Sequence, residues 1–226
     1  WFSVIDFKDA FWSCPLDSRC RDIFAFTWED PDTGREQQLR WTHLPQGYTE
    51  APTLFGQALE DLLSSFSPPE GIQVTQYVDD LLLSGEQEST VRTATIQLLN
   101  FLGRNGLRVS KPKLQFVLQE VKYLGHLIGH GTKKLSAKRV EGILNLPPAT
   151  SKREIRQLLG LFGYCRLWID QYSQSAKFLY EKLIEEEPFN WDNSDTQKLQ
   201  NLKEKLTKAP ILSLPSLEKP FYLFVN

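Results

Sequence analysis

The chain has 226 residues, 41% of them hydrophobic and 24% charged, with a net charge of −2 at pH 7. These values are typical of a folded globular protein with one large domain or two smaller ones, and they exclude a disordered or fibrous chain. Because no apolar run is long enough to cross a membrane and no signal-peptide pattern opens the chain, we expect an intracellular protein without a membrane partner.

Cysteine and histidine form no metal-binding pattern in this sequence. The three cysteines, Cys14, Cys20 and Cys165, include no C-x-x-C pair, and their odd number indicates free thiols. The histidines stand apart from them, so a structural zinc site, the alternative, lacks the ligand spacing that it requires. Because the chain contains no methionine, we expect the natural polypeptide to begin upstream of Trp1.

The small net charge conceals a division between two halves of the chain. Residues 1–100 carry 6 basic and 16 acidic side chains, a net charge of −10, whereas residues 101–226 carry 20 basic and 12 acidic side chains, a net charge of +8. Within 104–156 there are 12 basic against 3 acidic side chains. This division suits a metal site next to a surface that binds phosphate groups, although solvated surface charge would give the same composition.

In chain order, the first half of the sequence alternates strands and helices. Apolar β-formers predict a strand within 1–11 that leads into a turn or short helix, and a hairpin that joins 24–28 to 39–44. Helical spacing of apolar residues predicts helices over 54–66 and 91–102. We also expect two short β segments in 74–83 and short strands at 107–109 and 115–117.

The pattern becomes helical after Pro147-Pro148. Ser151 and Glu154 form a capping-box pattern that predicts the start of a helix. A polar helix is expected over 194–207, and a strand over 221–225. The sequence therefore predicts an α+β region first and a helical region later, with a boundary between 130 and 150.

Adjacent carboxylates, Asp79 and Asp80, interrupt the apolar segment 76–83. Apolar neighbours indicate a largely buried hairpin, where two charges about 4 Å apart would repel by about 4 kcal/mol at an effective dielectric of 20. A bound divalent cation would remove that cost, although a solvated Asp-Asp turn explains this segment equally well when it is taken alone. Asp6 also lies in an apolar strand, and as a third carboxylate it would complete an oxygen-rich site for Mg²⁺.

Five ordered motifs resemble those of one enzyme family. They are residues 6–11 (DFKDAF), 44–47 (LPQG), 77–80 (YVDD), 106–113 (GLRVSKPK) and 123–125 (YLG), and their order and approximate spacing are similar to the palm motifs of retroviral reverse transcriptases. Residues 165–169 (CRLWI) and 189–191 (FNW) resemble the gammaretroviral type, which includes endogenous-retrovirus Pol polyproteins and the polymerase of murine leukaemia virus. The resemblance covers essentially the whole chain.

The resemblance implies a fold class and a domain order. An α+β palm, an antiparallel sheet with packed helices, would occupy 1–132, a helical thumb 133–208, and the first strand of a truncated connection region 209–226. The chain would be a piece of a longer polyprotein, without the preceding fingers and without a ribonuclease H domain. Such a protein acts in the cytoplasm or the virion, and the sequence does not indicate whether it is a monomer or a dimer.

The resemblance also implies an RNA-directed DNA polymerase that adds dNTPs to a primer 3′-hydroxyl on an RNA or DNA template. Asp6 and Asp79 would hold two Mg²⁺ ions, which Mn²⁺ could replace, and Asp80 would be the less direct third carboxylate. Phe11 would lie under the incoming sugar and exclude a 2′-hydroxyl; the alternative for Phe11 is plain core packing.

Further site residues follow from the same resemblance. Gln46 and Gly47 would touch the template and the incoming nucleotide, and Lys113 would protonate pyrophosphate unless it is an ordinary surface lysine. The residues that would face the primer end are Tyr77, Val78, Tyr123, Leu124 and Gly125. The thumb residues that would contact duplex phosphates, without reading sequence, are Lys152, Arg153, Arg156 and Arg166.

Other functions are compatible with parts of the sequence. A catalytically inactive endogenous-retrovirus remnant would bind nucleic acid or a protein partner without incorporating nucleotides. A metal-dependent phosphohydrolase would explain the carboxylates and leave the ordered motifs unexplained. A viral RNA polymerase that copies RNA would share the fold but not the combination of Phe11 with the Y-x-D-D motif.

Overall fold

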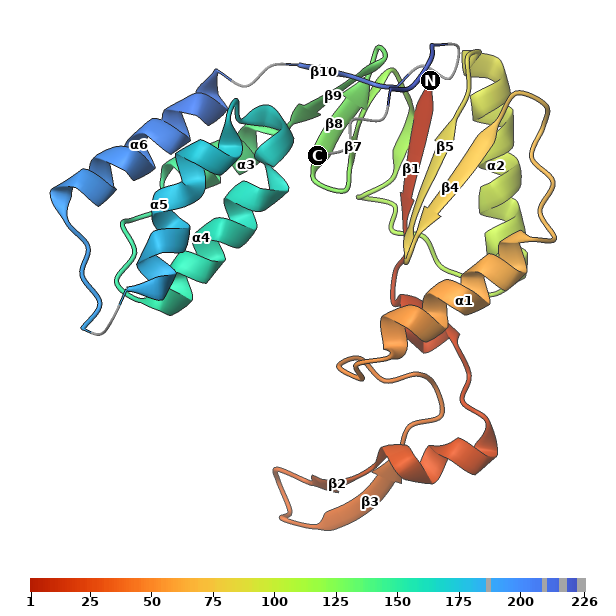
Figure 1. Ribbon diagram of the computed structural model, residues 1–226. Coiled ribbons are helices and arrows are strands. Elements are labelled where there is room, and N and C mark those ends of the chain that lie inside the picture. The colour runs from red at the N-terminus through yellow and green to blue at the C-terminus, as the bar shows by residue number, and fades with distance from the viewer. Residues whose placement is uncertain (186–187, 209–210, 216–218, 223–226) are drawn as a thin grey trace. The chain divides into compact units, whose positions relative to one another are not determined.

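The computed structural model describes residues 1–185, 188–208, 211–215 and 219–222. The chain divides into two compact units, Trp1–Val121 and Lys122–Asn226, which are considered separately below (Figure 1). In the described part of the chain, no helix combines the length and the apolar character that a membrane span needs. The mixed helix and antiparallel sheet confirm the predicted α+β fold class, whereas the assignment of 1–132, 133–208 and 209–226 to palm, thumb and connection stays a prediction.

A four-stranded antiparallel sheet forms the centre of the first unit, in the order β4 (Gln73–Tyr77), β5 (Asp80–Ser84), β1 (Phe2–Asp6) and β6 (Gln115–Leu118). Helices α1 (Ala51–Leu63) and α2 (Glu88–Arg104) supply the rest of its core (Figure 1). The apolar side chains recur on each helix at the spacing of one face, which is why both segments are helical and buried on one side. The buried cluster consists of Ile5, Phe7, Phe55, Leu59, Leu81, Leu83, Ala94, Leu98 and Leu102.

A buried hydroxyl fixes the pairing of β1 inside this sheet. The Oγ of Ser3, which is fully buried, accepts the backbone N–H of Val117 at 3.0 Å and lies 2.9 Å from Thr95 Oγ1. Val117 has a φ of 52°, and the register of β1 against β6 shifts at this point. The shift takes the N–H of Val117 out of the strand ladder, so the Ser3 hydroxyl satisfies a backbone donor that would otherwise be unpaired.

A two-stranded ribbon, β2 (Ala25–Glu29) with β3 (Glu36–Arg40), also belongs to the first unit. Every residue of both strands is exposed. The ribbon follows two short 3-10 helices, η1 (Ala10–Ser13) and η2 (Ser18–Phe24), and its aromatic side chains pack on one another, as in the Phe26–Trp41 pair at 5.9 Å. Local aromatic contacts therefore stabilise a ribbon that has no buried side chain of its own.

The second unit combines a small sheet with a group of helices. The sheet has the order β10 (Leu212–Ser213), β9 (Thr132–Leu135), β8 (His126–Gly129) and β7 (Glu120–Tyr123). The helices are α3 (Ala137–Leu144), α4 (Lys152–Tyr164), η3 (Arg166–Trp168), α5 (Tyr172–Ile184) and α6 (Asn193–Thr207). Their apolar faces meet in one cluster that includes Ile155, Phe162, Trp168, Leu179 and Leu202.

A buried ion pair joins α5 to α6. Lys182 Nζ lies 2.9 Å from Asp195 Oδ2, and the two side chains are 9% and 5% exposed. Asp195 is also the third residue of α6, where it completes a capping box with Asp192: each side chain accepts the other residue's backbone N–H. The Asp195 carboxylate thus accepts a backbone N–H at the start of α6 and also pairs with the buried Lys182 ammonium.

The structure confirms most of the elements predicted from sequence. The helices expected at 54–66, 91–102 and 194–207 form, as do the expected strands other than those at 107–109 and 221–225, with shifts of a few residues at their ends. The strand expected at 107–109 is wrong, because only Val109 pairs, in an isolated bridge with Phe7. Of the strand expected at 221–225, residues 223–225 lie outside the described part of the chain, and Phe221 and Tyr222 have no regular structure.

The capping box expected at α4 forms only in part. Ser151 accepts the N–H of Glu154, as predicted. The Glu154 carboxylate instead accepts the N–H of Thr150 at 2.7 Å, one residue before the position that the pattern indicates. The predicted helix start is therefore correct, but the Glu154 side chain caps the N–H of Thr150 and not that of Ser151.

Candidate catalytic site

The hairpin of β4 and β5 carries two of the three predicted carboxylates. Tyr77 pairs with Asp80, so the turn consists of Val78 and Asp79 alone. Val78 has a φ of 53°, a backbone conformation that two-residue hairpin turns favour but that β-branched residues rarely adopt. The turn therefore presents Asp79 at its tip at the cost of local backbone strain.

The third carboxylate, Asp6, meets this hairpin through strand pairing. Asp6 ends β1 and lies directly opposite Asp80 in the antiparallel register. Burial raises the pKa of Asp80, and the neighbouring charges of Asp79 and Asp6 raise it further. Asp80 is therefore close enough to Asp6 and Asp79 to be repelled by both, and a cation placed among the three would lower that repulsion.

Lys113 supplies one such cation. Its Nζ lies 3.2 Å from Asp6 Oδ1, although the lysine side chain is 67% exposed. Residues 110–114 are positioned by backbone bonds, since the N–H of Ser110 donates to the Asp6 carbonyl and the N–H of Leu114 to the Ser110 carbonyl. The ammonium thus neutralises part of the acidic site from a segment that is fixed against β1.

The donor chemistry of this site fits Mg²⁺, but the ligands are not gathered around one point. Carboxylate oxygens are the ligands that Mg²⁺ prefers, and here they come from two paired strands and one tight turn. Within the described residues, no group of three or more acidic, histidine or cysteine side chains is arranged to hold a metal ion. The Asp6, Asp79 and Asp80 side chains would therefore have to converge when an ion binds.

Gln76 is a site residue that the sequence analysis missed. Its Nε2 donates to the Gly56 carbonyl of α1 at 2.8 Å and to the Val78 carbonyl at 3.1 Å. The side chain therefore ties helix α1 to the strained turn. The signal was present in the alternation of β4, because Gln76 falls on the half-buried face with Val74, where an apolar residue is the usual choice.

The remaining predicted residues of the first unit lie in different surroundings. Phe11, in η1, is half-buried and packs edge-on against Phe55 of α1, with ring centroids 6.0 Å apart. Gln46 and Gly47 lie in an exposed loop, and the φ of 92° at Gly47 explains the glycine. Tyr77 is exposed, and its contact with the primer end stays a prediction.

We expect Val78→Gly to stabilise the first unit by about 1 kcal/mol. Removing backbone strain of about 1–3 kcal/mol outweighs the entropic cost of glycine, which is about 0.5–1 kcal/mol. Urea denaturation measures the change. The matched control is the reverse change, Gly71→Val, at a φ of 78° with no atom within 4 Å of the added Cβ. A less stable Val78→Gly protein would show that side-chain packing at Val78 outweighs its strain.

In the second unit, the predicted primer-end residues form the turn between β7 and β8. Tyr123 ends β7 and is buried, whereas Leu124 and Gly125 form the turn, with φ values of 47° and 77°. Left-handed backbone at two successive positions is typical of tight hairpins. The turn therefore presents its backbone and the half-exposed Leu124 side chain to the surroundings.

The predicted thumb cations divide into two kinds. Arg153, Arg156 and Arg166 are exposed on α4 and η3. Lys152 is half-buried, and its ammonium donates to the Glu185 carbonyl at 2.5 Å, just beyond the end of α5. Lys152 therefore has a structural role, because it donates a hydrogen bond to a carbonyl at the end of α5. The three exposed arginines are better placed to contact a ligand.

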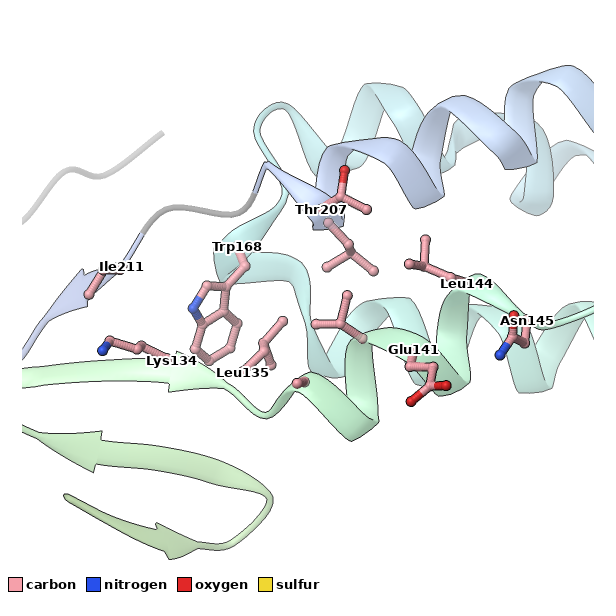
Figure 2. Close-up of a pocket in the computed structure, with 11 residues that line it drawn as sticks. Lys134, Leu135, Glu141, Leu144, Asn145, Trp168, Thr207 and Ile211 are labelled. Atoms are coloured by element: carbon pink, nitrogen blue, oxygen red, sulfur yellow. The ribbon is translucent and has the colours of Figure 1, made fainter.

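A pocket of about 540 Å³ lies elsewhere in the second unit and contains none of the predicted site residues (Figure 2). Leu135, Leu144, Trp168 and Ile211 contribute to its apolar lining, and Lys134 and Glu141 to its polar edge. The Trp168 indole N–H is buried without a hydrogen-bond partner among the described residues. Two other pockets do contain site residues: one of about 660 Å³ is lined by Gln76 and Val78, and one of about 490 Å³ by Gly125.

Comparison with known proteins identifies the family. The sequence model of the family described as "Reverse transcriptase (RNA-dependent DNA polymerase)" matches residues 1–128, more than half of the chain. The chain belongs to the reverse transcriptase family. The matched region contains all three carboxylates, the Lys113 segment and the turn at Leu124 and Gly125.

The relatives of this chain include retroviral polyproteins. This reverse transcriptase is 43% identical over its whole length to the Gag-Pol polyprotein of avian reticuloendotheliosis virus, 41% to the Pol polyprotein of feline endogenous virus ECE1 and 40% to the Gag-Pol polyprotein of gibbon ape leukemia virus. The chain spans 20%, 22% and 14% of these polyproteins, respectively. They support the predicted resemblance to gammaretroviral and endogenous-retroviral Pol.

Solved structures show the same fold. The foamy viral protease-reverse transcriptase dRH in complex with double-stranded DNA has a TM-score of 0.83 and 30% identity, over 94% of this chain and 36% of that one. The foamy viral protease-reverse transcriptase in complex with an RNA/DNA hybrid has a TM-score of 0.81 and 29% identity, over 94% and 28%. The reverse transcriptase fold expected from the sequence is thus confirmed.

Proposed function

We propose that this chain carries the polymerase chemistry of a retroviral reverse transcriptase, the template-directed addition of dNTPs to a primer 3′-hydroxyl. The observation that carries the proposal is the pairing of Asp6 opposite Asp80, beside Asp79 at the hairpin tip, within a reverse transcriptase domain. An acidic site formed by strand pairing and a two-residue turn is suited to phosphoryl transfer, which depends on positioning and charge neutralisation.

Asp6 and Asp79 would hold two Mg²⁺ ions, with Asp80 as the third carboxylate. Ions held by these carboxylates would supply Lewis acidity for the primer hydroxyl and positive charge opposite the leaving pyrophosphate. The chain's own contribution is the geometry: Gln76 fixes the turn against α1. Lys113 Nζ, 3.2 Å from Asp6 Oδ1 on a side chain that is 67% exposed, would be the proton donor to the leaving pyrophosphate.

A template–primer duplex is the proposed macromolecular ligand. The foamy viral structures are complexes with double-stranded DNA and an RNA/DNA hybrid, and residues 101–226 of this chain carry a net charge of +8. The exposed Arg153, Arg156 and Arg166 would bind phosphates without reading sequence. The turn of Leu124 and Gly125 would lie against the primer end.

We expect Phe11→Val to increase the use of ribonucleotides relative to deoxynucleotides by about 10- to 200-fold, the range that a change of one or a few methylenes in a substrate pocket produces. Phe11 is half-buried and packs edge-on against Phe55, so part of its side chain remains accessible. Single-nucleotide incorporation of rNTP and dNTP measures the ratio. Leu54→Val, at an exposed α1 position, is the control, and an unchanged ratio in Phe11→Val would assign Phe11 to the core.

Primer extension on an RNA template with Mg²⁺ or Mn²⁺ tests the proposed function. Incorporation that depends on the metal and the template supports it. The alternative, an inactive remnant that binds nucleic acid, predicts salt-dependent duplex binding without incorporation. The assay is run on this chain and on a longer Pol polypeptide that contains it, so that a missing neighbouring segment is distinguished from a defective site.

A further inference from the structure

Tyr164, at the end of α4, makes contacts that the proposed function does not use. Its hydroxyl donates to the Leu124 carbonyl at 2.5 Å and lies 2.9 Å from His126 Nδ1. Leu124 and His126 stand on either side of Gly125, in the β7–β8 hairpin. The Tyr164 hydroxyl thus forms hydrogen bonds with the residues before and after Gly125. Tyr164 itself lies about 40 residues further along the chain.

The direction of these hydrogen bonds follows from the proton count. A tyrosine hydroxyl has one proton to donate, and the Leu124 carbonyl takes it. The bond to His126 therefore runs from the imidazole Nδ1–H to the phenol oxygen. Burial lowers the pKa of His126, and the charges of Lys133 and Arg139 lower it further, whereas a hydrogen bond with the Leu124 backbone raises it.

The ring of Tyr164 is fixed as firmly as its hydroxyl. The Arg139 guanidinium lies over it, 4.2 Å from the ring centroid. The His126 ring stacks on Tyr164 at 5.0 Å and on Trp168 at 5.2 Å. Residues from α3, α4, η3 and β8 therefore meet in one stack of rings and charge, which restricts the phenol to a single orientation.

Gly125 shows how closely the turn is held. Its φ of 77° is the left-handed region, and a Cβ added there would lie 2.9 Å from an Arg139 nitrogen and 3.1 Å from the Tyr164 hydroxyl. The turn thus approaches the stack so closely that only glycine fits without movement. All of these groups belong to the second unit.

We propose that Tyr164 is a positioning residue, whose hydroxyl fixes the Leu124–Gly125 turn so that the turn aligns a primer 3′ end for attack. The inference rests on the proposed function, because it takes the turn to be a primer contact. Tyr164 itself acts through the backbone of Leu124 and the His126 ring. Losing the hydroxyl should therefore slow incorporation while the ring stack, and with it the fold, remains.

The test compares Tyr164→Phe with wild type in single-turnover incorporation. We expect the incorporation rate to fall by about 2- to 12-fold, the equivalent of one of the two lost hydrogen bonds, with unchanged template–primer affinity and a retained fold. Tyr180→Phe, at an exposed tyrosine of α5, is the matched control and should behave as wild type. An unaltered rate in Tyr164→Phe, or an equal loss in both variants, would overturn the proposal.

A second pair of measurements separates this inference from the proposed function. Amide hydrogen exchange at Leu124, Gly125 and His126 should be faster in Tyr164→Phe than in wild type. Equal exchange rates would contradict the inference, whether or not the protein is active. If neither the wild-type chain nor a longer Pol polypeptide that contains it incorporates nucleotides, the polymerase proposal fails. The positioning claim is then decided by 2-aminopurine at the primer 3′ end: a signal that Tyr164→Phe alters supports it, and identical signals refute it.

Discussion

Asp79→Asn should reduce nucleotide incorporation by at least about 10²- to 10³-fold, the cost of removing one preorganised electrostatic group from an active site. The asparagine keeps the shape of the side chain at the tip of the turn, so the hairpin of β4 and β5 should remain folded. It removes one of the two carboxylates proposed to hold both metal ions. Primer extension with Mg²⁺ measures the loss, and duplex binding is measured in parallel.

Duplex binding by Asp79→Asn distinguishes a loss of catalysis from a loss of substrate binding. Because Asp79→Asn removes a negative charge, duplex binding should be retained or slightly stronger. Asp61→Asn, an exposed position on α1, makes the same charge change away from the carboxylates and should leave incorporation intact. Normal extension by Asp79→Asn would remove the proposed metal site, and equal losses in the two variants would indicate a general effect of charge.

Lys182→Met should lower the free energy of unfolding of the second unit by about 3 kcal/mol, because it leaves the buried Asp195 carboxylate with only the more exposed Lys198 Nζ, 4.0 Å away, as a cation. Lys182 and Asp195 are 2.9 Å apart, with side chains only 9% and 5% exposed. Methionine replaces the aliphatic part of the lysine, so the loss reports the charge and not a cavity. Urea denaturation followed by circular dichroism measures it.

The same helix provides the control for this pair. Lys177 and Glu181 are 3.5 Å apart in α5, with side chains 73% and 56% exposed. Lys177→Met should change stability by less than about 1 kcal/mol, since solvent screens the pair. Similar changes in the two variants would mean that burial of the Lys182–Asp195 pair contributes little to the stability of this unit.

Much of the first unit could be predicted from the sequence, because its elements are long or strongly patterned. Val91, Ala94, Leu98 and Leu102 recur at helical spacing, which predicted a helix there. All four residues are buried in α2. The adjacent carboxylates within apolar segments indicated a hairpin turn, and the turn forms at Val78 and Asp79. Asp6 could be assigned to the site only from its apolar strand and from the family resemblance. The sequence does not encode its pairing opposite Asp80, because that pairing joins two strands far apart in the chain.

The second unit was harder to predict, because its strands are short. β7, β8 and β9 have four residues each, too few for alternation to be distinguished from chance, and β10 has two. The contacts of Gln76 and Tyr164 could not be predicted either. Each depends on a carbonyl group that another element brings within reach, and no pattern in sequence encodes which carbonyl that will be.

The β2–β3 ribbon will govern how the protein behaves in a concentrated sample. Both of its strands are exposed along their whole length, and Phe26, Trp28 and Trp41 leave 37% to 40% of their surface in water. Open strand edges beside aromatic side chains are templates for intermolecular pairing. Concentration, more than temperature, should therefore limit the shelf life of the purified chain. Activity that declines on concentration would then reflect colloidal self-association, and kinetic work belongs in dilute solution.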